Sequence, residues 1–200
     1  MSKLFGLIFI LLLMVSIYLL VSFDMNSSTK QSLESTPVQS VKIVMLGDSI
    51  TFRTNWRILL NRNDVLNRGI NGNTTGDMLK RLDEIINMKP EYCFIMGGIN
   101  DLSQGFAVEK IYENYISLIQ KLIRNRIKPV IQSTLFVSSA IFEAVEINRQ
   151  VEELNSRLKE FAENNQIDFI DVNGSLSGKT GLMADFTNDG IHLSPRGYRA

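Results

Sequence analysis

From residue 41 onwards, short apolar runs alternate with amphipathic helical patterns. The apolar runs cover residues 41–46, 65–67, 92–96, 129–134 and 167–172. Between them, apolar residues recur every three or four positions, most clearly over residues 108–123 and 151–161. Strands without a polar face, separated by helices, are typical of a parallel sheet buried on both sides. The pattern therefore predicts an α/β fold, a three-layer αβα sandwich.

Composition limits the classes of function. The 200 residues suffice for one domain of ordinary size. Lysine plus arginine (21) equals aspartate plus glutamate (21), so the chain lacks the basic excess of a nucleic-acid-binding protein. The single cysteine excludes an internal disulfide and a cysteine-cluster metal site, and the single histidine excludes a histidine-rich zinc site.

Residues 4–23 are almost continuously apolar and follow Lys3. About 20 such residues span the roughly 30 Å core of a bilayer as a helix. The apolar part of a cleaved signal usually has only about 7–15 residues. We therefore expect residues 1–24 to be a transmembrane anchor, with a cleaved secretion signal as the alternative. Both place the rest of the chain outside the cytoplasm. The polar residues 25–40 predict a flexible linker, and residues 41–200 the domain.

Ligands of parallel sheets bind at the carboxyl ends of the strands, so the residues after each strand are the first candidates. Ser49 lies at a strand-to-helix turn, as a nucleophile or as a helix cap. Gly72 lies after the second strand, in a segment without the glycine spacing of a dinucleotide site. Its amide can approach a ligand closely, or the glycine can simply form a turn.

Asn100 and Asp101 follow the third strand. We expect the Asn100 amide to point into the same crevice as Ser49 and Asp101 to cap the next helix, although both residue types are also common in turns. His192 follows Asp189 by three residues in a loop. A turn can then bring the carboxylate to the imidazole and orient it. A nucleophile, a base, an orienting acid and two further donors at one sheet edge are the set that acyl transfer requires.

Several other side chains have two interpretations. Thr74 and Asp77 form a capping-box pattern that predicts a helix through about residue 87. Phe52 and Trp56 suit either an acyl pocket or the core. Arg53 and Arg68 are candidates for binding an anionic group, and Cys93 lies in an apolar run typical of core residues.

Four short segments of the sequence, called blocks here, each contain one of the candidate residues at the strand ends. These four blocks resemble those of the SGNH hydrolases, also called the GDSL lipase/esterase family. The Ser, Gly, Asn and His of that name correspond to Ser49, Gly72, Asn100 and His192. The first block reads Gly-Asp-Ser-Ile rather than Gly-Asp-Ser-Leu, whereas the third matches G-x-N-D and the last matches D-x-x-H. The resemblance covers about residues 41–198. Within the family, the second block and the ending Asp-Gly-Ile-His-Leu look most like the platelet-activating-factor acetylhydrolase-like branch.

The resemblance implies a flavodoxin-like sheet of five parallel strands in the order 2-1-3-4-5. It also implies that Ser49 is the nucleophile, His192 the base and Asp189 the orienting acid, with an oxyanion hole made by the Ser49 and Gly72 amides and the Asn100 side chain. No metal or cofactor is implied. The family normally continues into a final helix, so we expect the C-terminal helix to be truncated at Ala200.

These observations predict a serine ester hydrolase that acts through an acyl-enzyme. Short-acyl esters, O-acetylated glycans and lysolipids near the membrane are the candidate substrates. The alternatives are an acyltransferase on a surface polysaccharide and a noncatalytic or incomplete protein with the same fold. The sequence indicates neither the ester nor the oligomeric state.

Overall fold

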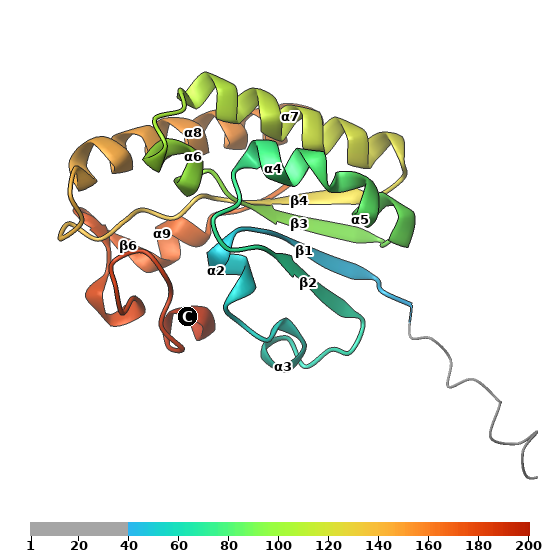
Figure 1. The fold of residues 1–200 in the computed structure, drawn as a ribbon, viewed down its shortest axis with the longest axis horizontal. Coiled ribbons are helices and arrows are strands. Elements are labelled where there is room, and N and C mark those ends of the chain that lie inside the picture. The colour runs from blue at the N-terminus through green and yellow to red at the C-terminus, as the bar shows by residue number, and fades with distance from the viewer. Residues whose placement is uncertain (1–39) are drawn as a thin grey trace, which may run out of the picture. The chain divides into compact units, whose positions relative to one another are not determined.

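The computed structural model describes residues 40–200, whose helices and strands are arranged around a parallel sheet (Figure 1). Its strands are β1 (Ile43–Gly47), β2 (Val65–Gly69), β3 (Tyr92–Met96), β4 (Lys128–Gln132) and β5 (Asp168–Ile170). Their order in the sheet is β2-β1-β3-β4-β5, and every neighbouring pair is parallel. The predicted α/β class, strand number and strand order are confirmed.

The helices connect these strands. They are α2 (Ser49–Phe52), α3 (Trp56–Leu59), α4 (Thr75–Lys80), α5 (Leu82–Met88), α6 (Ile99–Ser103), α7 (Val108–Arg124), α8 (Ala144–Asn165) and α9 (Val172–Leu176). Two short 3-10 helices cover Ala184–Phe186 and Gly197–Arg199, and β6 (Ser177–Gly178) pairs with β7 (Gly181–Leu182) in a small antiparallel hairpin.

The two faces of the sheet carry unequal layers (Figure 1). Helices α4, α5, α7 and α8 cover one face, whereas the short α3 and α9 lie on the other. On the latter side a cavity of about 500 Å³ separates Trp56 of α3 from Gln132 and Ile170 at the ends of β4 and β5.

The apolar periods of the sequence become the buried faces of the two long helices. In α7, Ile111, Tyr115, Leu118 and Leu122 are all completely buried, as the spacing of three and four residues requires. They pack with the central strands, whose Val44, Leu46 and Ile95 are also inaccessible to solvent.

The helix predicted from residue 74 differs from the structure in one respect. Its capping box is present, because Thr74 and Asp77 each accept a hydrogen bond from the other's backbone amide. The helix is then interrupted at Arg81, which separates α4 from α5. The Arg81 guanidinium donates to the Gly47 carbonyl and to Asn73 Oδ1, so a tertiary contact occupies the position of the interruption.

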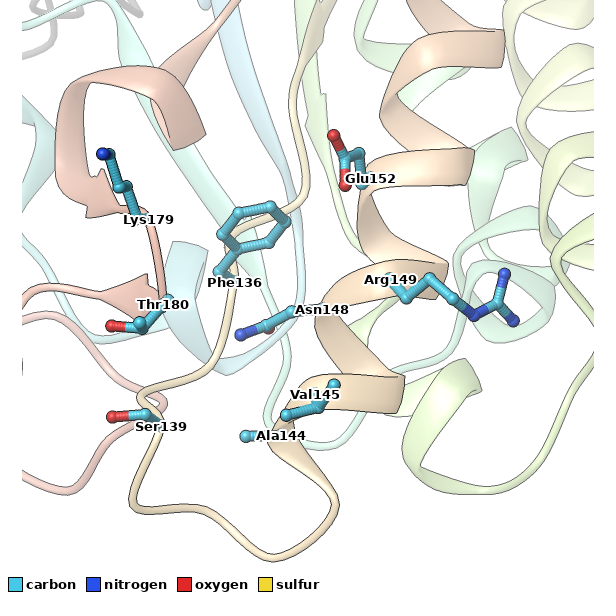
Figure 2. Close-up of a pocket in the computed structure, with 10 residues that line it drawn as sticks. Phe136, Ser139, Ala144, Val145, Asn148, Arg149, Glu152, Lys179 and Thr180 are labelled. Atoms are coloured by element: carbon cyan, nitrogen blue, oxygen red, sulfur yellow. The ribbon is translucent and has the colours of Figure 1, made fainter.

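The β6–β7 hairpin was not predicted from the sequence. Figure 2 shows Lys179 and Thr180 of this hairpin facing Asn148 and other residues of α8 across a cavity of about 380 Å³. The Asn148 side chain links α8 to the segment after β4, because it accepts a hydrogen bond from Val137 N and donates one to Val137 O.

Between residues 40 and 200, no helix combines the length and the apolar character needed to cross a bilayer. The predicted anchor at residues 1–24 and nearly all of the predicted linker lie outside the described residues.

Candidate active site

Ser49 is the first residue of α2, directly after β1 and the turn residue Asp48. The Asp48 carboxylate accepts from Ile50 N at 2.9 Å and so caps the helix. Ser49 is 7% exposed, and its side chain lies at the carboxyl edge of the sheet. The structure therefore assigns the cap to Asp48 and leaves the Ser49 hydroxyl free for another partner.

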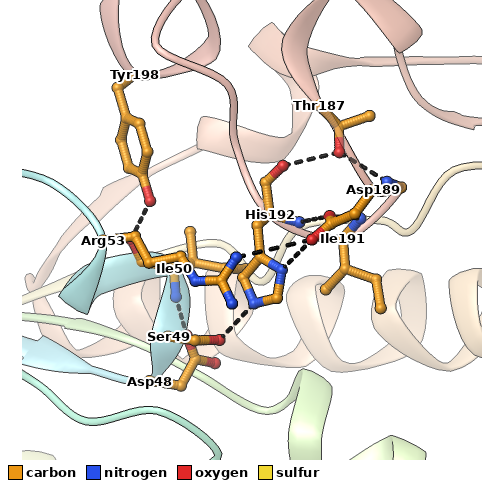
Figure 3. Close-up of polar contacts among 10 residues, drawn as sticks. Asp48, Ser49, Ile50, Arg53, Thr187, Asp189, Ile191, His192 and Tyr198 are labelled. Carbon is orange, nitrogen blue, oxygen red and sulfur yellow. Dashed lines mark hydrogen bonds and ion pairs between the residues drawn. The ribbon is translucent and has the colours of Figure 1, made fainter.

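That partner is His192, which lies 143 residues away in the sequence. Figure 3 shows the imidazole between Ser49 and Asp189, with Nε2 2.9 Å from Ser49 Oγ and Nδ1 2.6 Å from Asp189 Oδ2. An ionised carboxylate can only accept, so the Nδ1 atom carries the proton in this pair. The Nε2 atom of a neutral imidazole can then accept the hydroxyl proton of Ser49.

The loop around His192 is held by further hydrogen bonds. The backbone amides of Ile191 and His192 both donate to Asp189 Oδ1, and Thr187 Oγ1 donates to the His192 carbonyl. Thr187 Oγ1 also accepts from Gly190 N, and Gly190 has φ = +86°, a backbone region that favours glycine. The side chains of Thr187 and Asp189 thus keep the loop in the conformation that directs the imidazole toward Ser49.

The two carboxylates near Ser49 have opposite shifts of pKa. Partial burial raises the pKa of Asp189, but the hydrogen bonds from His192 and Ile191 outweigh it and lower the pKa to about 2. Burial raises the pKa of Asp48 to about 6, against the lowering effects of the Ile50 amide and the charge of His192. Asp189 is therefore the ionised partner of the imidazole, whereas Asp48 is a buried carboxyl whose Oδ2 has no partner among the described residues.

Arg53 lies at the C-terminal end of α2 and faces the same group. Its Nη1 is 3.7 Å from Asp189 Oδ2, and the side chain is 47% exposed. At this distance the contact is electrostatic, and the guanidinium keeps N–H donors for other partners. Of the two arginines that sequence analysis raised, Arg53 lies beside the site, whereas Arg68 is in β2.

Gly72 and Asn100 come from two segments that contact each other, the turn after β2 and the first turn of α6. Gly72 is exposed, with φ = +75°, in the turn after β2. Asn100 lies in α6, and its Nδ2 donates to the carbonyl of Asn73, the neighbour of Gly72. An amide group has two N–H donors, so the second donor of Asn100 is available to a ligand.

Comparison with known proteins agrees with this geometry. The sequence model of the GDSL-like lipase/acylhydrolase family matches residues 45–200. The chain belongs to this family. The matched residues therefore form a GDSL-like lipase/acylhydrolase domain. The match does not divide the family into branches, so the placement near platelet-activating-factor acetylhydrolases stays a prediction.

Individual proteins are similar to this chain over most of its length. A solved GDSL-like lipase from Bacteroides thetaiotaomicron is 25% identical, with a TM-score of 0.71 over 87% of this chain and 90% of that one. An acetylxylan esterase from Geobacillus stearothermophilus is 27% identical over 145 residues, which are 67% of this chain and 66% of the esterase.

A third relative is an N-acylneuraminate cytidylyltransferase from Streptococcus agalactiae, 30% identical over 151 residues. The match covers 76% of this chain but only 34% of the relative. The chain thus spans about a third of the length of the curated relatives that it matches first.

One sequence-based expectation about this GDSL-like site is wrong. Asp101 does not cap its own helix, because it lies inside the first turn of α6. Its carboxylate instead accepts from the backbone amide and the hydroxyl of Thr75, the first residue of α4. Asp101 therefore joins the loops that carry Gly72 and Asn100, a contact between residues 26 positions apart that local sequence patterns do not indicate.

The structure also gives the surroundings of Phe52, Trp56 and Cys93, three residues whose sequence context did not decide their role. The Trp56 indole donates to Thr51 O at 2.8 Å and packs edge-on against Tyr198, while Phe52 is 52% exposed. Cys93 is completely buried in β3, and burial raises the pKa of its thiol to about 12, so it belongs to the core. In residues 40–200, no group of three or more His, Cys, Asp and Glu side chains is arranged to hold a metal ion.

The residues that sequence analysis missed are Asp48, Thr187 and Gly190. For Thr187 and Gly190 a signal exists, because the sequence Thr-Asn-Asp-Gly at residues 187–190 is typical of a turn. In such turns a threonine hydroxyl often bonds a nearby backbone amide. No comparable signal exists for Asp48, whose 1% exposure results from packing.

Proposed function

We propose that the protein hydrolyses O-acetyl esters of glycans by a Ser-His-Asp mechanism. The observation that carries the proposal is the unbroken contact from Ser49 Oγ through the His192 imidazole to Asp189, at 2.9 and 2.6 Å. Ser49 Oγ attacks the ester carbonyl while His192 Nε2 takes its proton. Asp189 keeps the proton on Nδ1 and stabilises the imidazolium that forms.

The remaining steps conserve atoms and protons. The tetrahedral intermediate collapses as His192 gives its proton to the departing alcohol, which leaves an acetyl group on Ser49. Water then attacks the acetyl carbon, His192 accepts a proton from it, and acetate leaves as that proton returns to Ser49. In this proposal, the Ser49 and Gly72 amides and the Asn100 side chain stabilise the negative oxygen. Loss of one such donor typically raises the barrier by about 3–4 kcal/mol.

The names of two relatives favour a glycan ester. One acts on acetylxylan, and the other is named for an N-acylneuraminate, an acidic sugar. Short-acyl esters in general and lysolipids are the remaining candidates, and the length of the acyl chain separates them. We further propose that residues 4–23 anchor the protein in a membrane with residues 40–200 on the outer side, because this run is apolar and follows Lys3.

The test is hydrolysis of p-nitrophenyl esters from acetate to palmitate, and of acetylated xylan, by the full chain and by Ser49→Ala. We expect turnover that depends on Ser49 and falls steeply beyond short acyl chains, with acetate released from the glycan. Turnover unchanged in Ser49→Ala would remove Ser49 from the mechanism. A preference for palmitate would favour a lipid substrate.

Adding a polysaccharide acceptor to the same reaction distinguishes hydrolysis from transfer. Free acetate as the main product supports the proposal, whereas acetylated acceptor as the main product would favour an acyltransferase. A correctly folded protein without either product would support a noncatalytic role.

A further inference from the structure

A second group of polar side chains borders the site beyond Arg53. A cavity of about 500 Å³ lies between the segment joining α2 to α3 and the C-terminal segment that follows His192. Its polar lining includes the guanidinium groups of Arg53 and Arg199 and the side chains of Thr54 and Asn55. None of its lining residues is an aspartate or a glutamate. The cavity therefore holds two positive charges without a negative lining residue.

Four of the nine other arginines among the described residues are paired closely with a carboxylate. Arg62, Arg149, Arg157 and Arg196 each hold a carboxylate oxygen at between 2.6 and 2.9 Å. Within residues 40–200, Arg199 makes no ion pair, and the only carboxylate near Arg53 is that of Asp189, at 3.7 Å. Asp189 already bonds His192 and two backbone amides, so it neutralises Arg53 only in part.

The cavity between α8 and the β6–β7 hairpin provides a contrast (Figure 2). It is also lined by basic side chains, Arg149 and Lys179, but Glu152 lines it as well. Arg149 is moreover paired with Glu146 and Glu153. The charge of that cavity is therefore largely compensated, unlike the charge around Arg53 and Arg199.

We propose that the cavity of Arg53 and Arg199 binds an anionic group on the alcohol part of the ester, so that the enzyme prefers acidic sugar esters. Guanidinium groups bind carboxylate and phosphate through paired N–H donors, and both chemistries fit two arginines. Arg53 both lines the cavity and lies 3.7 Å from Asp189, so an anion bound there lies beside the group that contains Ser49. Figure 3 shows Arg53 next to Asp189 and His192. This inference rests on the proposed function.

Three esters that differ only at carbon 6 of the sugar test the inference. They are the 3-O-acetyl derivatives of methyl glucoside, methyl glucuronoside and methyl glucoside 6-phosphate, which are neutral, carboxylate and phosphate substrates. The readout is the ratio of kcat/KM for an acidic ester to kcat/KM for the neutral one. We expect a ratio of about 10 or more, and its size for carboxylate and for phosphate identifies the preferred anion. Raising the salt concentration lowers the ratio, because exposed charges are screened.

Arg199→Gln is the decisive variant, since Arg199 makes no contact with the Ser49–His192–Asp189 group. We expect it to reduce the ratio about tenfold, mainly through KM, which corresponds to one charge-assisted contact. Arg196→Gln, three residues away and paired with Asp185 outside the cavity, is the matched control with an unchanged ratio. A wild-type ratio near one, or a ratio unaffected by Arg199→Gln, would overturn the inference while leaving ester hydrolysis intact.

Binding to the Ser49→Ala protein separates this inference from the proposed function. If none of the three esters reacts with wild-type enzyme, the proposed function is wrong, and the cavity is tested by titration with glucuronate and inorganic phosphate. Binding that is weakened in Ser49→Ala/Arg199→Gln would support the anion site. No binding of either anion to Ser49→Ala would contradict it.

Discussion

Asp48 is an unusual neighbour for a nucleophilic serine. Its carboxyl is 1% exposed, and only one of the two oxygens has a hydrogen-bond partner in the described part of the chain. Burial disfavours the charged form, and this is why its pKa is raised to about 6. The folded protein therefore binds a proton on Asp48 more readily than the unfolded chain does.

This shift predicts a pH-dependent stability. A raised pKa contributes stability that is complete below the unfolded value of 3.8 and is lost as pH rises through about 6. A difference of about two pKa units corresponds to about 3 kcal/mol. Asp48→Asn keeps the acceptor for Ile50 N and cannot ionise. Between pH 4 and 7, the unfolding free energy of the wild type should therefore fall by about this amount relative to that of Asp48→Asn. Urea unfolding at both pH values measures the unfolding free energy of the two proteins. An equal change in this free energy for both proteins between pH 4 and 7 would refute the prediction.

Asp189 has the opposite character, because the hydrogen bonds that it accepts favour the charged form. We expect Asp189→Asn to lower kcat for p-nitrophenyl acetate by about 100-fold or more, since an amide no longer keeps the proton on His192 Nδ1. The asparagine oxygen can still accept from the Ile191 and His192 amides, so the loop is retained. Steady-state kinetics with a circular-dichroism check of folding tests this. An unchanged kcat would mean that Asp189 does not orient the imidazole.

At the scale of the elements, hydrogen bonds from α7 and from the segment after β4 hold Gly97, directly after the carboxyl end of β3. The buried Tyr115 hydroxyl of α7 accepts from Gly97 N and donates to Gly97 O, and Thr134 Oγ1 also donates to that carbonyl. Asn100 and Asp101 follow directly in α6. The position of Asn100 thus depends on α7 and on the end of β4 as well as on its own strand.

Tyr115→Phe tests this connection. It leaves the Gly97 amide buried without a partner, and we expect a loss of about 1–3 kcal/mol in unfolding free energy. Tyr112→Phe, in the same helix, is the matched control, because the Tyr112 hydroxyl has no hydrogen-bond partner in residues 40–200 and its ring still contacts Arg157. Equal stability of the two variants in urea would show that the Tyr115 hydroxyl does not hold the end of β3.

The helix α2, which begins with Ser49, also packs closely against the end of β2. A methyl group added at Gly69 would lie 2.3 Å from Phe52 N and 2.7 Å from Phe52 Cα, both backbone atoms of α2. Neither atom can move without displacing the helix. We expect Gly69→Ala to destabilise the fold by about 1–3 kcal/mol. Gly76→Ala is the control, since its nearest atom would be a side-chain oxygen at 3.6 Å. Thermal unfolding of both variants measures the difference, and equal melting temperatures would contradict it.

At the scale of the whole molecule, residues 40–200 contain a complete sheet, its core and the Ser49–His192–Asp189 group. We therefore expect a protein that begins at Ser40 to unfold in one cooperative transition and to hydrolyse p-nitrophenyl acetate with the kcat of the full chain. Calorimetry and kinetics on both proteins test this. A protein from Ser40 that does not fold would show that the first 39 residues contribute to the domain.

The sequence by itself determined the fold class and indicated which residues at the strand ends are candidates for the site. Strand and helix periods are local properties of the chain, so the parallel sheet and the buried face of α7 followed from the spacing of apolar residues, whereas the number and order of the strands followed from the family resemblance. The four family blocks identified Ser49, Gly72, Asn100 and His192 as candidates. Their catalytic roles, like the anchor at residues 1–24, stay predictions.

Only the tertiary structure decided which side chains meet and which are buried. The contact of Ser49 with His192 spans 143 residues, and that of Asp101 with Thr75 spans 26. The burial of Asp48 and the shared cavity of Arg53 and Arg199 likewise come from segments that meet only in the folded chain. Distance and solvent exposure are set by packing among remote segments, and a residue's neighbours in sequence carry no record of them.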